Sequence, residues 1–369
     1  FSLVLNTLVL KIAKDNDGSS LLLQACYLDD GVLAGPRSAL QRVLSLLQQD
    51  GPALGLFINL GKCEIFSPNN LEGFPEQMEK SHNPCLVVLG IPIGDAEFCA
   101  SFISAKRAGS RALLDKLEEV GAIDPHVALT LIHLCGGFCR LNHLARATPP
   151  SLSVKALQIF DEDVRQCFSA STGIDTSDAA WQQAQLSLSR GGLGLRSLSH
   201  HASAAFIASL SSSGSASDSS HHLSDAVGIF NNLVPVEDSL RVEDLLSSAI
   251  PQSKLSQKLD NHLFSSLMEA STIANRARLL SVSSPHAASW LSMPPCERQG
   301  LHLDPSQFQV ATKWWLGLDI SGGTQCAMCP EKSLDPLGHH ATTCKRGGDV
   351  VFRHNRLRDI VAETCCRAH

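Results

Sequence analysis

Three cysteines and two histidines near the C-terminus have the residue types and the close spacing of a metal site. Cys326 and Cys329 are separated by two residues, and Cys344 follows the adjacent pair His339 and His340. Thiolate and imidazole groups are the usual ligands of tetrahedral Zn²⁺ in structural sites. The spacing predicts a zinc site of three cysteines and one of the two histidines. Free thiols in a loop are the alternative interpretation.

Two adjacent carboxylates, Asp29 and Asp30, lie between short apolar segments at 21–27 and 32–34. Apolar runs on both sides of an Asp-Gly turn predict a β-hairpin. Aspartate suits turns, which would explain the pair without any function. Carboxylate oxygens on a rigid hairpin also suit the divalent ions of phosphoryl transfer. Four residues do not decide between these interpretations.

The elements that must position these groups follow from the periodicity of the apolar residues. It predicts helices over 1–14 and 38–49, strands over 57–66 and 85–93, and a long helix with a buried stripe over 154–168. From residue 98 onward the periodicity is helical. The expected fold class is therefore α+β, with mixed structure in the first hundred residues and mainly helices after them.

The order of three segments in the first hundred residues resembles the second half of the palm of a reverse transcriptase from a non-LTR retrotransposon. These segments are the Tyr-x-Asp-Asp tetrapeptide at 27–30, the lysine-bearing turn and strand at 55–64, and the Leu-Gly pair at 89–90. In that family the hairpin holds catalytic Mg²⁺. The resemblance implies that Asp29 is the principal metal-binding carboxylate and that Asp30 is its supporting neighbour.

The same resemblance implies roles for four further residues. Tyr27 would pack near the primer terminus, and Leu89 and Gly90 would form a hairpin that grips the primer. Lys62 would lie close to the incoming triphosphate, where a cation offsets developing charge or protonates the leaving pyrophosphate. A solvated lysine at a strand end is an equally good interpretation of Lys62.

The C-terminal region extends the resemblance to the R2-like class of these elements. The knuckle that follows their reverse transcriptase has four residues before the last cysteine, which favours His339 over His340 as the ligand. Segment 347–359 resembles the start of their restriction-like endonuclease. Nucleic-acid contacts are then expected from the basic residues Lys345, Arg346, Arg353, Arg356 and Arg358. A basic amphipathic helix on a surface explains the arginines equally well.

The architecture implied by the resemblance is a truncated right hand: late palm (1–100), helical thumb and connector (101–300), and zinc knuckle with a truncated start of the endonuclease (301–369). The implied cofactors are Mg²⁺ and Zn²⁺, and the implied partners are an RNA template, target DNA and dNTPs, with no membrane.

Fingers and another metal-binding aspartate should precede the hairpin. Without them we expect no polymerisation by this chain alone, because misplacing reactants by ~1 Å can cost ~10²-fold in rate. A non-enzymatic, zinc-dependent nucleic-acid-binding relic or a domesticated interaction protein is the alternative.

The composition of the chain limits the classes of protein to which it can belong. With 369 residues, 44% of them hydrophobic, the chain can bury two or three cores, which excludes a disordered tail or a small disulfide scaffold. Thirteen cysteines, an odd number in a chain of this size, favour free thiols or metal in a reducing compartment, nuclear or cytoplasmic. No apolar run is long enough to predict a membrane-spanning helix. The net charge is −6, whereas segment 345–369 has six basic and three acidic residues, so any basic face must be local.

Two further patterns are interpreted as structural. Cys135, Cys139 and His143 recur every four residues but span about 12 Å on a helix, too far for one ion, so core packing of one helical face is expected. The glycines at 191, 192 and 194 lack the preceding strand and the full spacing of a dinucleotide-binding loop. We interpret them as a turn.

Overall fold

The computed structural model describes residues 2–14, 21–213, 220–320, 323–329, 331–346 and 349–367. Residues 347 and 348, which begin the predicted endonuclease-like segment, lie outside this part. The structure is 63% helical with a few small sheets, consistent with the α+β prediction. It separates into two compact units, Phe1–Phe102 and Ile103–His369, which are described one at a time.

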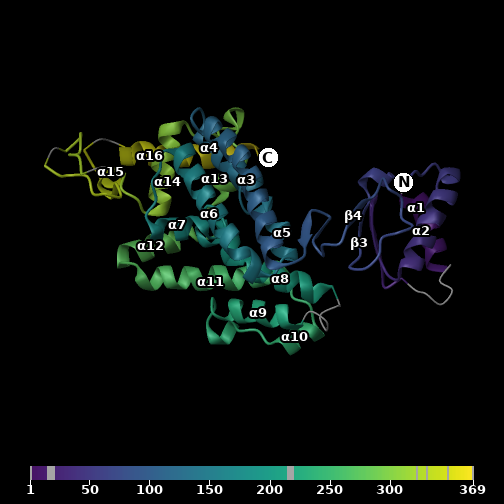
Figure 1. The fold of residues 1–369 in the computed structure, drawn as a ribbon. Helices are drawn as coiled ribbons and strands as arrows, with labels where there is room; N and C mark the ends of the chain where they lie inside the picture. Colours follow the sequence, from purple (N-terminus) through teal and green to yellow (C-terminus); the bar gives the residue numbers. More distant parts are fainter. Residues whose placement is uncertain are drawn as a thin grey trace. The chain divides into compact units, whose positions relative to one another are not determined.

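The helices are α1 (Ser2–Lys14), α2 (Arg37–Asp50), α3 (Ala96–Gly121), α4 (Pro125–Leu131), α5 (Asn142–Ala147), α6 (Pro150–Thr172), α7 (Asp178–Gln185), α8 (Leu198–Ser212), α9 (Ser220–Asn231), α10 (Val242–Ser247), α11 (Gln252–Ala270), α12 (Ile273–Val282), α13 (Ser289–Ser292), α14 (Pro305–Leu316), α15 (His339–Thr343) and α16 (Asp349–Arg367) (Figure 1). The strands are β1 (Leu23–Tyr27), β2 (Asp30–Ala34), β3 (Glu64–Phe66), β4 (Glu79–Ser81), β5 (Leu86–Val88) and β6 (Ile91–Ile93). In the described residues, no helix is both long and apolar enough to cross a bilayer.

The first unit is built on helices α1 and α2, which match the predicted helices. Each buries a few apolar side chains, among them Leu8 on α1 and Val43 on α2. An exposed ion pair between Lys11 and Asp50, 2.5 Å apart, also joins the two helices. Because so few side chains are fully buried here, this unit has a much smaller core than the second one.

Three separate two-stranded sheets complete the first unit. β1 and β2 form the predicted antiparallel hairpin, β3 pairs with β4 in parallel, and β5 pairs with β6 antiparallel. The long strands predicted at 57–66 and 85–93 are wrong. The first contains only β3, because residues 60–62 form a 3₁₀ turn. The second reverses at Leu89 and Gly90, whose φ values of 51° and 76° match the tight turn of a two-residue hairpin.

The second unit is organised around α6, the long helix that the buried stripe predicts. Pro150 begins it, and Gly173, with φ of 66°, ends it in the left-handed conformation common after helices. Phe160 and Phe168 on this helix are almost completely buried. α6 packs against α4 and α8, and α8 packs against α5, α9 and α11 (Figure 1).

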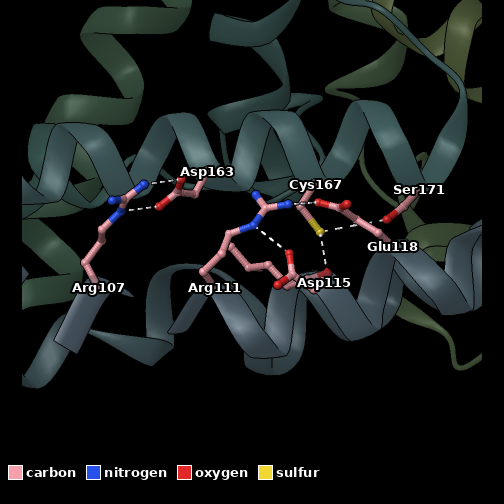
Figure 2. A network of polar contacts seen from close by, with 8 residues as sticks. Arg107, Arg111, Asp115, Glu118, Asp163, Cys167 and Ser171 are labelled. Carbon is pink, nitrogen blue, oxygen red and sulfur yellow. Dashed lines mark hydrogen bonds and ion pairs between the residues drawn. The ribbon is translucent and has the colours of Figure 1, made fainter. Parts of the chain in front are cut away.

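A polar network joins α3 to α6 (Figure 2). The Arg107 guanidinium donates two hydrogen bonds, of 2.5 and 2.6 Å, to the buried Asp163 carboxylate. Cys167 on α6 donates to the Leu114 carbonyl, and burial raises the pKa of this thiol to about 11. Cys167 is therefore an inert, protonated core residue at neutral pH. The network aligns two helices and leaves no reactive group.

The two structural patterns in this unit have different outcomes. The glycine turn is confirmed: Gly191, with φ of 75°, ends a 3₁₀ turn, and a Cβ at Gly192 would lie 1.9 Å from the Leu186 carbonyl oxygen. Core packing of Cys135, Cys139 and His143 is wrong, because all three are exposed. The chain there changes from a π-helical turn to a 3₁₀ turn before α5 begins, so the three residues never share one regular helix.

Candidate functional site: a cysteine and histidine metal centre

Two of the candidate metal ligands lie on a tight turn. The Cys326 N–H donates to the Lys332 carbonyl at 3.0 Å, and the Lys332 N–H donates to the Cys329 carbonyl at 3.1 Å. An antiparallel bridge between Gln325 and Ser333 closes the turn behind them. Both cysteines are 6% exposed. The local backbone therefore brings the two thiols together.

The other two ligands lie on the short helix α15 and just after it. The Asp335 carboxylate accepts hydrogen bonds from the backbone N–H groups of His339 (2.9 Å) and His340 (2.7 Å), and so caps the first turn of α15. Although desolvation alone would raise the pKa of Asp335, these two donors lower it overall. An ionised carboxylate at the N-terminal end of a helix also interacts favourably with the helix dipole. Asp335 therefore fixes the direction in which α15 leaves the turn.

The four ligand atoms have the spacing of a tetrahedral site. The Sγ atoms of Cys326, Cys329 and Cys344 and a ring nitrogen of His340 all lie within 4.8 Å of one another. The Cys344 sulfur is 3.7 Å from that of Cys329 and 4.0 Å from that of Cys326. Zn–S bonds of ~2.3 Å in a tetrahedron place sulfurs ~3.8 Å apart. Soft thiolates and an imidazole at these distances fit zinc, which this cluster could hold.

His340 replaces His339 as the candidate histidine ligand. The Nε2 atom of His340 is 2.9 Å from the Cys329 sulfur, whereas His339 is not part of the cluster. At about 100° per residue, positions four apart on a helix differ by ~40° and positions five apart by ~140°. His340 therefore points to the same side of α15 as Cys344, and His339 points away. The spacing becomes Cys-x2-Cys-x10-His-x3-Cys.

The electrostatics of the cluster favour a bound cation. Backbone N–H groups of Cys329 and Met328 donate to the Cys326 sulfur and lower the pKa of Cys326 to about 6. Desolvation, with the neighbouring sulfurs of Cys344 and Cys326, raises the pKa of Cys329 to about 11. Desolvation and repulsion between the sulfurs therefore keep Cys329 protonated at neutral pH, and a divalent ion would offset this repulsion and allow all three cysteines to be thiolates.

The acidic hairpin places its two carboxylates in a different setting. Tyr27 pairs with Asp30 across the hairpin, and the turn between them passes through Leu28, whose φ is 54°. Asp29 and Asp30 are exposed. Among the described residues they belong to no group of three potential metal ligands, so the structure does not support the Mg²⁺ site.

The other residues predicted to serve polymerisation are spread over the first unit. Lys62 ends an exposed 3₁₀ turn, and Leu89, 53% exposed, occupies the tip of the β5–β6 hairpin with Gly90. Tyr27 is 64% exposed on β1. Their roles at a primer terminus or a triphosphate therefore remain predictions.

The basic residues begin directly after the last metal ligand. Lys345 and Arg346 are exposed, and Arg346 lies 3.1 Å from Glu331 in the turn that carries the first two ligands. Arg353 on α16 donates to the Thr342 carbonyl on α15 at 2.8 Å. The further arginines of α16, Arg356 and Arg358, are also exposed. The structure thus links the basic segment to the candidate metal centre.

Sequence reasoning missed a buried group of serine, histidine and aspartate. The Ser256 hydroxyl is 3.1 Å from Nδ1 of His201, and Nε2 of His201 is 3.6 Å from the Asp260 carboxylate, which Arg196 also binds. All three residues of this group are at most 3% exposed. A substrate has no access to Ser256, so the group is a polar contact between α8 and α11 rather than a catalytic triad.

It also missed an apolar cavity of about 560 Å³ beside the metal centre. The cavity is lined by α12–α14 and by α15, with tryptophans Trp290, Trp314 and Trp315 among its walls. The adjacent tryptophans at 314 and 315, shortly before the first metal-site cysteine, are the one available signal in the sequence. The exposure and the partners of these tryptophans depend on distant helices, so the sequence alone does not predict the cavity.

The fold and the site define a mostly helical protein of the α+β class with a candidate three-cysteine, one-histidine metal centre. No protein-family model matches this chain, and no curated protein matches it.

Proposed function

We propose that this chain is the late palm, thumb and zinc knuckle of a reverse transcriptase of the R2-like non-LTR class. By itself it binds nucleic acid through the zinc-dependent knuckle and the basic segment that follows, and it does not polymerise DNA. The observation that carries the proposal is the cluster of Cys326, Cys329, His340 and Cys344, whose ligand atoms converge within 4.8 Å.

The order of elements in the first unit supports the family part of the proposal. The carboxylates of the Tyr-x-Asp-Asp tetrapeptide sit at the tip of the β1–β2 hairpin, and the lysine-bearing turn and the Leu-Gly hairpin follow it in the expected order. A helical region then leads to the knuckle. Three short elements in one order, followed by this knuckle, are more specific than any one of them.

The knuckle would act as the support for a basic surface. Zn²⁺ supplies structural cross-linking when bound, since its ligands come from both the turn and α15. Lys345 and Arg346 follow the last ligand directly, and the Arg353 side chain holds the start of α16 against the Thr342 carbonyl. Holding these cations in one place allows them to contact successive phosphates, which makes binding weaken with salt.

Polymerisation is not expected from the described residues. Two exposed neighbouring carboxylates, Asp29 and Asp30, would have to hold the ions without a third acidic ligand nearby. Two-metal phosphoryl transfer needs ions held ~3.5–4 Å apart by several rigid ligands. The hairpin then supports the family assignment, and the nucleic-acid contact is made elsewhere in the chain.

Binding of the full chain to a fluorescent oligonucleotide at several salt concentrations tests the proposal. Zinc-loaded protein should bind with an affinity that falls as salt rises, and Arg353→Gln with Arg356→Gln should reduce the salt dependence by about two phosphate contacts. Cys329→Ser should abolish the gain that zinc provides. The matched control is Cys135→Ser, which removes an exposed cysteine outside the cluster. Binding that is insensitive to zinc and to both arginines would refute the nucleic-acid role.

Primer extension with Mg²⁺ and dNTPs tests the other half of the proposal. We expect no incorporation by the chain alone. Incorporation that disappears in Asp29→Ala would show a working polymerase site and overturn this part.

A further inference from the structure

The cavity beside the metal centre has the size and the lining of a ligand site. Its volume of about 560 Å³ lies within the ~300–1,000 Å³ range of small-molecule sites, and its walls are mainly apolar. Val310 and Trp314 from α14 line one side, and Gly338, Ala341 and Thr342 line the side formed by α15. Since α15 carries His340 and leads into Cys344, the metal centre determines where this wall stands.

Two of the three tryptophans in the cavity already have structural roles. The Trp315 indole N–H donates to the Gly192 carbonyl, and the Trp315 carbonyl accepts from the side chains of Gln183 and the buried Arg278. Trp290 packs edge-on against Trp315, with ring centroids 5.7 Å apart. These contacts hold both rings in the core.

Trp314 has no such role. It is half-buried and lines the cavity, and within the described part of the chain its indole ring makes no hydrogen bond and no ring contact. An indole that is partly exposed to an apolar cavity offers a large flat surface to a planar group.

A cation lies beside the cavity. Thr342, a lining residue, receives a hydrogen bond from the Arg353 guanidinium on its carbonyl, so this cation stands at the rim. Lys345 lies three residues further along and is exposed. An apolar aromatic interior beside cations matches the chemistry of a nucleotide, whose base is flat and whose phosphate is anionic.

We propose that the cavity receives one unpaired nucleobase of a single strand, which stacks on Trp314 while Lys345 and Arg353 bind the neighbouring phosphates. This inference rests on the nucleic-acid binding proposed above. Because the walls offer few polar groups, the site takes any base and discriminates single strands from duplex rather than one sequence from another. Loss of the metal displaces the α15 wall and with it the site.

The test compares an oligothymidylate with an abasic oligonucleotide of the same length, both binding to the zinc-loaded full chain. The two probes have the same phosphate charge, so they differ only in the bases available for stacking. We expect the thymidylate to quench tryptophan fluorescence and to bind about 5- to 150-fold more tightly, the range for one stacked base. Trp314→Leu should reduce this preference to nearly none.

A second pair of variants tests the base site independently, in case Trp314→Leu does not fold. Val310→Glu places a carboxylate at the mouth of the cavity from a position that is 50% exposed, and it should also remove the preference for bases. Ile273→Glu makes the same charge change at an 86% exposed position of α12 that does not line the cavity. It should retain the preference.

The outcomes separate this inference from the proposed function. Equal binding of the two probes, or a preference that survives both Trp314→Leu and Val310→Glu, overturns the base site and leaves phosphate binding by the knuckle intact. Failure of both probes to bind at low salt overturns both the base site and the nucleic-acid role.

Discussion

The metal centre and the acidic hairpin both carry residues suited to binding ions, but they place those residues in opposite environments. The three cysteines are each 6% exposed and converge with His340, whereas Asp29 and Asp30 are exposed and, among the residues that the structure describes, belong to no group of three potential ligands. All four candidate zinc ligands lie within one short segment. A carboxylate site for Mg²⁺ draws its ligands from several elements. A site whose ligands lie in one short segment can therefore form where the structure does not support a site that needs ligands from distant segments.

The largest effect on the metal centre is expected from the removal of one cysteine. Cys329→Ser should abolish stoichiometric zinc binding and unfold the segment from the turn to α15, because structural zinc contributes its binding energy, of order 10 kcal/mol, to folding. Metal analysis of the purified full chain measures the first effect, and amide hydrogen exchange over residues 323–346 measures the second.

Cys135→Ser is the control for this change, since Cys135 is an exposed cysteine outside the cluster. Wild-type protein with much less than one zinc per chain, unchanged in Cys329→Ser, would refute the metal centre.

Replacing each of the two histidines by alanine tests which of them is the fourth ligand. His340→Ala removes an imidazole that lies 2.9 Å from the Cys329 sulfur, so zinc affinity should fall by more than the ~10–100-fold typical of outer-shell partners. His339→Ala should change it by less than about twofold. Competition with a chromophoric chelator measures both affinities, and a larger loss in His339→Ala would restore the ligand that the knuckle spacing favoured.

The two units should also differ in their response to acid. Burial, with the neighbouring charges of His200 and Arg196, holds the pKa of His201 well below its usual value of 6.5. A histidine whose pKa is lower in the folded than in the unfolded state stabilises the fold fully above pH 6.5, and that contribution is lost as the pH falls below 6.5. Each unit of lowering corresponds to about 1.4 kcal/mol. The first unit has one histidine, His82, and it is exposed.

Urea unfolding monitored by tryptophan fluorescence reports on the second unit, because all four tryptophans lie there. The free energy of unfolding should decrease between pH 6.5 and 5, and His201→Gln should flatten this decrease. His82→Gln should leave it unchanged. The same slope in His201→Gln and in the wild type would contradict the assignment.

The smallest effects are expected in the acidic hairpin. Asp29→Ala and Asp30→Ala remove exposed side chains, so the free energy of unfolding should change by no more than about 0.5 kcal/mol, and zinc content should not change. Calorimetry and metal analysis measure these two quantities. A change in oligonucleotide affinity above about twofold in either variant would show that the hairpin contacts nucleic acid in this chain.

Local patterns in the sequence determined a large part of the fold. The hairpin of β1 and β2, helices α1 and α2, and the buried stripe of α6 depend on residues close in the chain, and all are found in the structure. The cysteine and histidine spacing likewise predicted a metal cluster, because a turn and one helix suffice to bring its ligands together.

Tertiary structure decided what depends on direction or on distant partners. Asp335 caps α15 and turns His340, rather than His339, toward the cysteines. The interruption before α5 leaves Cys135 and Cys139 exposed where a regular helix was expected to bury them. The cavity lined by Trp314 and the buried contact of His201 with α11 each join helices that are far apart in the chain. Periodicity reports which face of an element is apolar, but only packing selects what that face meets.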